Sequence, residues 1–409
     1  MSTSVATPVA SRSTTRSGAR VTRRVAFVGM SASLLAFFVA AGAPTPLLPL
    51  YEQQWGFAPP LLTVAFGVYA FAMIAALLVF GSLSDYVGRR PVLIGALALE
   101  LASMVVFLFS ASITWLIVGR VLQGIATGVA SSTFGAAIVE LAPENRKKLG
   151  TVMSSLATTA GLAIGALFSG LVAYAMPGAA ASTVWLVLVV VMAAGTGLAV
   201  LAPETSSSRR GALASLVPRV SVPRPVRPLF VRTSPSIVAV FLLTALYLGL
   251  VPTVLSAVLH VTAPLVGGGV NFVLFAAGTL AAVITSGVHP HPLKTYGNVG
   301  MIIGVALFVA GVATDALPLV WASAVVAGTG AGAAFAGSNR GLIPEVAPHD
   351  RARLFSAIFV LAYVTFGGSA ILAGQIATVI GVEAMAIGFG LTAGLVAGAG
   401  VLVGARRSR

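Results

Sequence analysis

Apolar stretches long enough to cross a lipid bilayer recur along the whole chain. A hydrocarbon core about 30 Å thick needs about 20 helical residues at 1.5 Å each. Only 8% of the 409 residues are charged and 58% are apolar, whereas soluble proteins carry roughly 25% charged residues. This composition excludes a cytosolic enzyme, a secreted domain and a disordered chain. The twelve predicted helices span residues 25–49, 61–83, 91–110, 114–139, 150–175, 183–202, 236–258, 270–288, 298–314, 317–342, 354–380 and 384–405.

The basic residues predict how these helices are oriented. With a cytoplasmic N-terminus, the cytoplasmic segments hold 22 of the 24 Lys and Arg residues, and the other two, Arg120 and Arg340, lie inside predicted helices. Because Lys and Arg are retained in the cytoplasm, we predict a multi-pass protein of the cell (plasma) membrane with both termini cytoplasmic. Aromatic residues do not alternate with the basic ones as a stacking surface requires, so we expect no nucleic-acid partner.

The longest polar stretch divides the predicted helices into two sets of six. Residues 203–235 contain six prolines and six arginines, and residues 140–146 (ELAPENR) recur in part as 345–351 (EVAPHDR), half a chain length later. Paired six-helix halves are typical of transporters, whose substrate site lies near mid-membrane between them. We predict a disordered cytoplasmic tail (1–24), an N-terminal six-helix bundle (25–202), a cytoplasmic linker (203–235), a C-terminal six-helix bundle (236–405) and a cytoplasmic tail (406–409).

The loop between the second and third predicted helices carries a recognisable motif. Residues 81–93 read GSLSDYVGRRPVL and resemble the signature loop of the major facilitator superfamily (MFS). The resemblance extends to the twelve-helix plan and to the Pro-Glu-Thr sequence at 203–205. It implies an all-α membrane protein with the MFS fold, two pseudo-symmetric six-helix halves and a monomeric state.

The glycines and arginines of this loop have physical roles that do not depend on the family. Gly81 allows close contact between helices, and Gly88 allows a tight turn that few other residues tolerate. Arg89 and Arg90 supply the positive charge that keeps the loop cytoplasmic. A basic turn that only fixes topology is the simpler interpretation; a gating loop is the interpretation that the resemblance favours.

Asp85 is the acidic residue of this gating loop. A carboxylate among cations suits a helix N-terminus or an Arg partner. The resemblance implies that Asp85 docks against the start of the eleventh helix, near Arg353, and holds the cytoplasmic gate shut. Tyr86 stands where the family often has Arg, so part of the loop's charge relay differs here.

Two charged residues lie deep within predicted helices. An Arg inside a membrane costs about 2.5–3.5 kcal/mol on insertion scales and therefore needs a partner. Arg120, Gln123 and Gly124 on the fourth helix resemble the family's second motif, which implies that Arg120 lines the central cavity and acts in proton coupling or substrate contact; snorkelling to the surface is the alternative. Glu100 lies within about one helical turn of the depth of Arg120. It is either a proton switch, a member of a static ion pair, or a neutral carboxyl bonded to a backbone carbonyl.

The remaining candidates are polar residues on helices that the resemblance assigns to the cavity. We name Thr45, Tyr247, Asn339 and Arg340 as possible substrate contacts, although Arg340 lies near enough the surface to snorkel. On the fifth helix, residues 161–170 (GLAIGALFSG) partly resemble the family's antiporter motif, but small residues at this spacing also permit close helix packing.

These observations predict a secondary active transporter. We predict proton-coupled efflux (antiport) of a lipophilic or amphipathic small molecule by rocker-switch alternating access, because the predicted cavity is rich in apolar side chains and poor in carboxylates. The alternatives are a symporter or facilitative carrier for a small metabolite such as a sugar, or a non-transporting membrane scaffold. No phosphate-binding loop, metal cluster or hydrolase triad occurs, so we expect no enzyme, no metal and no cofactor besides the proton as coupling ion. The expected partners are the substrate, protons and the lipid bilayer.

Overall fold

The protein is a helical membrane protein of twelve spans. The computed structural model describes residues 21–218, 220–347 and 350–405, and every regular element in those ranges is a helix. Twelve of the helical segments are long and apolar enough to cross a membrane, which confirms the predicted number. The C-terminal tail (406–409) and most of the N-terminal tail lie outside the described residues.

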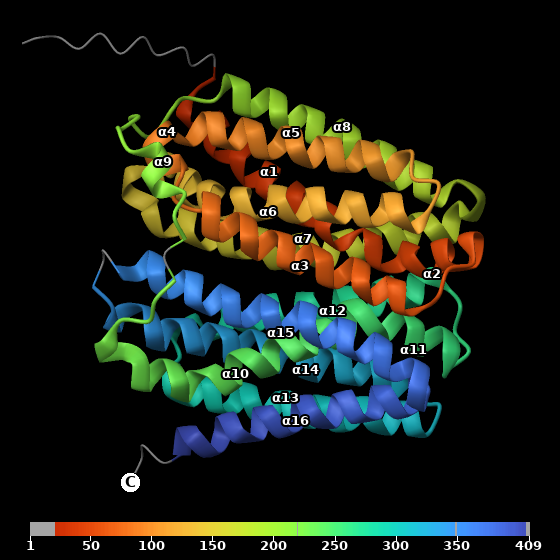
Figure 1. Ribbon diagram of the computed structural model, residues 1–409. Helices are drawn as coiled ribbons and strands as arrows, with labels where there is room; N and C mark the ends of the chain where they lie inside the picture. Colours follow the sequence, from red (N-terminus) through yellow and green to blue (C-terminus); the bar gives the residue numbers. More distant parts are fainter. Residues whose placement is uncertain (1–20, 219, 348–349, 406–409) are drawn as a thin grey trace, which may run out of the picture.

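The twelve spans form two bundles that lie one against the other (Figure 1). The N-terminal bundle is α1 (Arg23–Gly42), α2 (Pro44–Trp55), α3 (Pro60–Phe80), α4 (Ser84–Val87), α5 (Arg89–Leu108), α6 (Ile113–Leu141), α7 (Lys147–Ala175) and α8 (Ala180–Leu201). The C-terminal bundle is α10 (Arg227–Ala245), α11 (Val251–Ala257), α12 (Pro264–Ile284), α13 (Pro290–Ala313), α14 (Leu317–Leu342), α15 (Arg351–Ile380) and α16 (Val382–Ala405). The connection between them, with the short helix α9 (Ala212–Ser215), runs along one end of the molecule, which we call the linker end.

Prolines cause the main differences from the predicted boundaries. The first span was expected to stop at residue 49, yet α2 continues it to Trp55 with Pro44 in its first turn. The seventh was expected to begin at residue 236, but α10 begins at Arg227 and contains Pro235. Proline is tolerated in the first turn of a helix, where its missing N–H has no intrahelical acceptor, and this applies to Pro44 in α2 and Pro228 in α10. Pro235 lies in the interior of α10, which continues through it without that backbone hydrogen bond. Counting prolines as linker residues therefore made the predicted linker too long.

Close backbone contacts join the two bundles toward the end opposite the linker. A Cβ added at Gly367 on α15 would lie 2.9 Å from Ala70 Cβ on α3, and one at Gly268 on α12 would lie 2.5 Å from the carbonyl oxygen of Ala166 on α7. Nearer the linker end, Thr279 Oγ1 on α12 donates to Thr159 Oγ1 on α7 at 2.7 Å. Small residues let helices approach in this way without a hydrophobic driving force between them.

The glycine run at 161–170 lies in one of these packed regions. A Cβ at Gly161 would lie 2.5 Å from Phe38 Cβ on α1, and Ser169 Oγ donates to the carbonyl oxygen of Ala43 at 2.7 Å. The run therefore packs α7 against α1 on one side and, through Ala166, against α12 on the other. Close packing accounts for these small residues.

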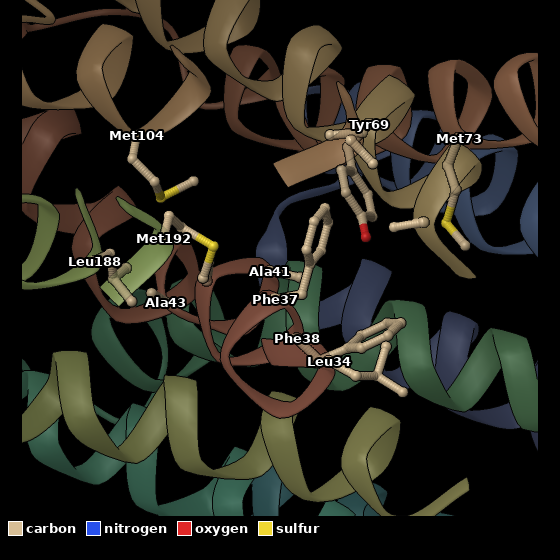
Figure 2. Close-up of a cluster of buried hydrophobic side chains, with 14 of the residues drawn as sticks. Leu34, Phe37, Phe38, Ala41, Ala43, Tyr69, Met73, Met104, Leu188 and Met192 are labelled. Carbon is tan, nitrogen blue, oxygen red and sulfur yellow. The ribbon is translucent and has the colours of Figure 1, made fainter. Parts of the chain in front are cut away.

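The interior of the N-terminal bundle is a large apolar cluster. Figure 2 shows Phe37 and Phe38 of α1 together with Tyr69 and Met73 of α3. Phe37 is fully buried and forms an edge-on contact with Phe134 of α6, their ring centroids 6.1 Å apart. The polar residues described next are embedded in this cluster.

Candidate functional site

A buried arginine on α6 is the centre of the candidate site. The Arg120 side chain is 2% exposed. Its Cζ atom lies over the Tyr69 ring, 4.2 Å from the centroid, and 5.3 Å from the centroid of Phe66, both on α3. Its Nε donates to the carbonyl oxygen of Ala65 at 3.3 Å. Cation–π contacts and a backbone acceptor thus hold the charge inside the bundle rather than at its surface.

Gln123 connects this arginine to the one buried acid nearby. Arg120 Nη1 donates to Gln123 Oε1 at 2.5 Å, and Gln123 Nε2 donates to Glu100 Oε1 at 3.2 Å and to the carbonyl oxygen of Ala40 at 3.0 Å. The orientation of the amide follows from its neighbours, because the reverse orientation would place its oxygen against two acceptors and its NH₂ group against the guanidinium. Glu100 and Arg120 therefore interact through an intervening amide.

Glu100 brings a carboxylate from α5 into this cluster. It is fully buried, and its Oε2 atom has no hydrogen-bond partner in the described part of the chain. One oxygen is held by Gln123 and the other is free to carry a proton. With the proton absent, the charges of Glu100 and Arg120 balance; with it present, the cluster carries a net positive charge.

The spacing of residues on α6 places these groups on one face. Arg120, Gln123 and Thr127 follow one another at intervals of three and four residues, which puts them on the same side of a helix. Gly124 faces α3, where an added Cβ would lie 2.5 Å from the carbonyl oxygen of Tyr69. The absence of a side chain at Gly124 thus lets α3 approach and brings the Tyr69 ring against Arg120.

The predicted gating loop lies at the linker end and is tied to the end of α8. Glu204 accepts hydrogen bonds from the backbone N–H groups of Arg89 (2.8 Å) and Arg90 (3.0 Å), and so caps the N-terminus of α5. Gly88 has φ +110°, and a Cβ there would lie 2.7 Å from Glu204 Oε2. Both the backbone conformation and the close carboxylate require glycine at this turn. The carbonyl of Gly81, at the end of α3, accepts from Ser132 Oγ on α6 at 2.9 Å.

Asp85 pairs within its own loop. Its carboxylate lies 2.5 Å from Arg89 Nη1, and Arg89 Nη2 lies 3.2 Å from Glu140 at the end of α6. The expected contact with Arg353 is absent among the described residues, because Arg353 Nη1 pairs with Asp350 at 3.0 Å in its own chain segment. Asp85 in α4 and Arg89 at the start of α5 flank the turn at Gly88, so they can pair without help from the other bundle.

The linker docks on this loop through backbone groups. The amide of Arg209 donates to the carbonyl oxygen of Tyr86 at 2.7 Å, and Ser82 Oγ donates to the carbonyl oxygen of Ser215 in α9 at 3.1 Å. The bond at Tyr86 uses its backbone carbonyl, so this anchor of the linker does not depend on the side chain at the position where the family often has an arginine. At the same end, a hydrogen bond from Lys147 and its positive charge, together with Arg23, hold the pKa of the Glu144 carboxyl below its ordinary value.

The four other predicted cavity residues have separate surroundings. Tyr247 is fully buried and its hydroxyl lies 2.5 Å from Ser323 Oγ, inside the C-terminal bundle. Arg340 donates to the carbonyl oxygens of Thr285 (2.7 Å) and Ala282 (2.9 Å) and so stabilises the C-terminal end of α12.

Thr45 and Asn339 each bury an oxygen that is unpaired among the described residues, Oγ1 and Oδ1 respectively. No hydrogen bond or ion pair within those residues joins Thr45, Tyr247, Asn339 or Arg340 to Arg120.

Three residues of these networks were missed from the sequence. Thr127 donates to the carbonyl oxygen of Gln123 at 2.7 Å, and its spacing from Arg120 was the available signal. Glu140 also accepts from Thr205 Oγ1 at 2.5 Å, and its place at the same helix end as the basic loop pointed to such a pairing. Glu204 was noted only as part of the Pro-Glu-Thr ending, since a cap supplied from a distant segment has no local signal.

Comparison with known proteins identifies the family. The model of the Major Facilitator Superfamily matches residues 30–370, from α1 to the middle of α15, which include the signature loop. The chain belongs to the Major Facilitator Superfamily. It is therefore a membrane transporter of this family, as the signature loop implied. Among solved structures, a point mutant of the nucleoside transporter NupG is similar over 92% of this chain and 99% of its own, with a TM-score of 0.69 and 12% identity.

Other similar proteins carry names that point to different solutes or to none. The human organic anion transporter MFSD10 (TETRAN) is similar over 92% of this chain and all of its own, with a TM-score of 0.65 and 16% identity. The inner membrane transport protein YajR of Escherichia coli is 35% identical over 105 residues, and the multidrug resistance protein MdtL of Klebsiella pneumoniae is 39% identical over 82. Those matches span 25% and 20% of this chain, and 23% and 21% of the length of these relatives.

Proposed function

We propose that this transporter exports a lipophilic or amphipathic small molecule in exchange for protons. The observation that carries the proposal is the buried cluster of Glu100, Gln123 and Arg120, in which one carboxylate oxygen has no partner among the described residues. A group that takes up and releases a proton inside the membrane changes the net charge of its surroundings. Ionisable residues in membrane spans commonly mark such proton pathways.

Gln123 links the protonation of Glu100 to Arg120. When Glu100 is ionised, Gln123 Nε2 donates to it and Gln123 Oε1 faces Arg120. A protonated Glu100 can itself act as a donor. Its hydrogen bond from Gln123 Nε2 then weakens, and so does the hydrogen bond that Gln123 Oε1 accepts from the guanidinium. Protonation of Glu100 thereby alters how firmly Arg120 is held against α3, at the interface between the bundles.

Alternating access is the second part of the proposal. The two bundles are joined by close glycine contacts toward the end opposite the linker, such as Gly268 against Ala166. At the linker end, Asp85 pairs within its own bundle. These contacts support a rocker-switch motion in which one end closes as the other separates. The linker end is then cytoplasmic, as the distribution of Lys and Arg predicts for a protein of the plasma membrane.

The cluster itself is tested by proton release from inside-out vesicles that are acidic inside and contain a pH-sensitive dye. Adding an exported compound outside should raise the internal pH in the wild type. Glu100→Gln should abolish this proton release, and Glu383→Gln, the same change at an exposed carboxylate at the start of α16, should leave it intact. Equal proton release from Glu100→Gln and wild type would remove Glu100 from the coupling path.

The same vesicles separate the alternative functions. A symporter for a metabolite such as a sugar would release protons only when its substrate is loaded inside the vesicles. A facilitative carrier would move radiolabelled compound without any change in internal pH. A scaffold would do neither, although the purified protein is folded. Either of the first two results would contradict antiport while leaving a transporter.

A further inference from the structure

Four half-buried aromatic side chains of the C-terminal bundle contact one another. Phe241 of α10 forms an edge-on contact with Phe335 of α14, with ring centroids 5.8 Å apart, and a tilted contact with Tyr363 of α15 at 5.5 Å. Phe359, one turn before Tyr363, stacks on it at 6.0 Å. We call Phe241, Phe335, Phe359 and Tyr363 the aromatic surface. None of its four side chains is fully buried, in contrast to Phe308 and Phe134 in the cores of the two bundles.

The aromatic surface lies where the two bundles meet. Phe241 packs against all three apolar clusters of the protein, and Tyr363 packs against the cluster of the N-terminal bundle as well as one of its own. The cluster of the N-terminal bundle that Tyr363 contacts includes Tyr69. Since the Tyr69 ring lies directly against Arg120, the aromatic rings lead from α14 across the interface to the buried guanidinium.

The guanidinium of Arg120 has a hydrogen-bond donor to spare. Nε and Nη1 each make one hydrogen bond, whereas Nη2 makes none within the described part of the chain. A guanidinium has five N–H donors in a planar fork that suits carboxylates and other planar acceptors. Nη2 is therefore the donor that an acceptor on a ligand can use.

Charge excludes one class of ligand. Glu100 is fully buried behind Gln123 and makes its hydrogen bond away from the interface. Arg340, the other arginine inside a predicted helix, donates to carbonyl oxygens at the C-terminal end of α12. A ligand at the aromatic surface therefore meets a positive charge first, and a cationic compound would be repelled there.

We propose that the aromatic surface and Arg120 together bind an aromatic compound that carries an anionic group, with its ring against Phe241 and Tyr363 and its anion on Arg120 Nη2. This substrate class rests on the proposed function, since it assigns the solute of the same transporter. The aromatic ring is the lipophilic part of the ligand, and its anionic group accepts a hydrogen bond from Arg120 Nη2.

The test is binding to the purified full-length protein in detergent, measured by isothermal titration calorimetry. The probes are 2-naphthoate, which has both features, 2-naphthylmethylammonium, which reverses the charge, and cyclohexanecarboxylate, which lacks the aromatic ring. The proposal expects 2-naphthoate to bind at least about tenfold more tightly than either control, because each control lacks either the aromatic ring contact or the charged hydrogen bond. Equal or tighter binding of the ammonium compound would overturn it.

Variants locate the binding site. Phe241→Leu and Tyr363→Leu should each weaken 2-naphthoate about three- to tenfold, and Arg120→Lys, which keeps the charge but loses the planar fork, should weaken it at least as much. Tyr174→Leu is the matched control, because Tyr174 is 63% exposed on α7. Unchanged affinity in Phe241→Leu and Tyr363→Leu would place the ligand elsewhere.

Binding and transport can fail separately. If 2-naphthoate binds as described but its addition to vesicles releases no protons, the assignment of the ligand stands and proton antiport fails. If other compounds release protons while 2-naphthoate does not bind, antiport stands and this assignment is overturned.

Discussion

Corresponding helix pairs in the two bundles pack differently: one pair is in backbone contact and the other is separated by side chains. In the C-terminal bundle, α13 and α14 meet backbone to backbone: a Cβ at Gly304 would lie 2.5 Å from Ala327 Cβ, and one at Gly330 would lie 2.5 Å from the amide nitrogen of Met301. In the N-terminal bundle, α5 and α6 hold side chains between them, including Glu100 hydrogen-bonded to Gln123.

The two pairs share one feature, a serine hydroxyl that donates to a glycine carbonyl across the pair. Ser103 Oγ donates to Gly119 at 2.9 Å in the N-terminal bundle, and Ser323 Oγ donates to Gly304 at 2.7 Å in the C-terminal bundle. The N-terminal pair has a charged residue and its amide partner between its helices, whereas the C-terminal pair is packed backbone to backbone.

The largest expected effect is from Arg120→Ala. Removing one member of a buried, linked charge pair costs about 3–5 kcal/mol because the remaining charge is left unpaired. We expect a large loss of unfolding free energy, measured in mixed SDS–detergent micelles, together with loss of coupled transport.

A double variant separates these two consequences. Arg120→Met combined with Glu100→Gln removes both charges, so it should regain most of the stability while remaining inactive in the vesicle assay. If the double variant were as unstable as Arg120→Ala, the contribution of Arg120 would be packing rather than charge balance.

Gly330→Ala should have the next largest effect on stability. Its new methyl group would meet backbone atoms of α13, which cannot rotate away, and overpacking of this kind typically costs about 1–3 kcal/mol. Gly398→Ala on α16 is the control, since nothing lies within 4 Å of its position. Gly119→Ala should cost less than Gly330→Ala, because it meets the Phe107 ring, which can shift. A greater loss of unfolding free energy in Gly119→Ala than in Gly330→Ala would contradict the tighter packing of α13 and α14.

Replacing Ser323 or Ser103 by alanine should reduce the unfolding free energy by a smaller amount, and the loss should be greater at Ser323. Ser323→Ala removes a bond to Gly304 and leaves the buried Tyr247 hydroxyl without its partner, at a cost of about 1–3 kcal/mol. Ser103→Ala removes one hydrogen bond, for which about 0.5–1.5 kcal/mol is typical. Adding Tyr247→Phe to Ser323→Ala should restore part of the loss in a double-mutant cycle. No restoration would mean that the hydroxyl finds another partner.

The smallest change in stability is expected for Asp85→Asn. The Asp85 side chain is 55% exposed, and exposed ion pairs contribute about 0–1 kcal/mol. The variant should therefore unfold like the wild type, yet transport more slowly if the loop acts as a gate. Transport would be measured as the initial rate of efflux from right-side-out vesicles. A wild-type rate would leave the loop with a topological role only.

Local features of the sequence were sufficient for the twelve spans, the family's signature loop and the identity of the buried charges. Apolar length is a property of each segment on its own, so the number of spans could be counted without knowing how they pack. The need for glycine at position 88 follows from a backbone turn with φ +110°. Arg120 and Glu100 stood out because charges are rare in a span, whatever surrounds them.

Partners that are distant in the chain could be found only in the tertiary structure. The cap that Glu204 places on α5, the pairing of Arg89 with Glu140 and the bridge through Gln123 each join segments whose separation carries no periodic signal. The occupation of Arg340 by the end of α12 was equally hidden. Hydrophobicity and local backbone preference act residue by residue and are written in the sequence, whereas hydrogen-bond partners and close helix contacts depend on how the helices pack. For this protein the sequence determined which segments cross the membrane, and the packing of α5 against α6 and of one bundle against the other decided what its buried charges and aromatic rings face.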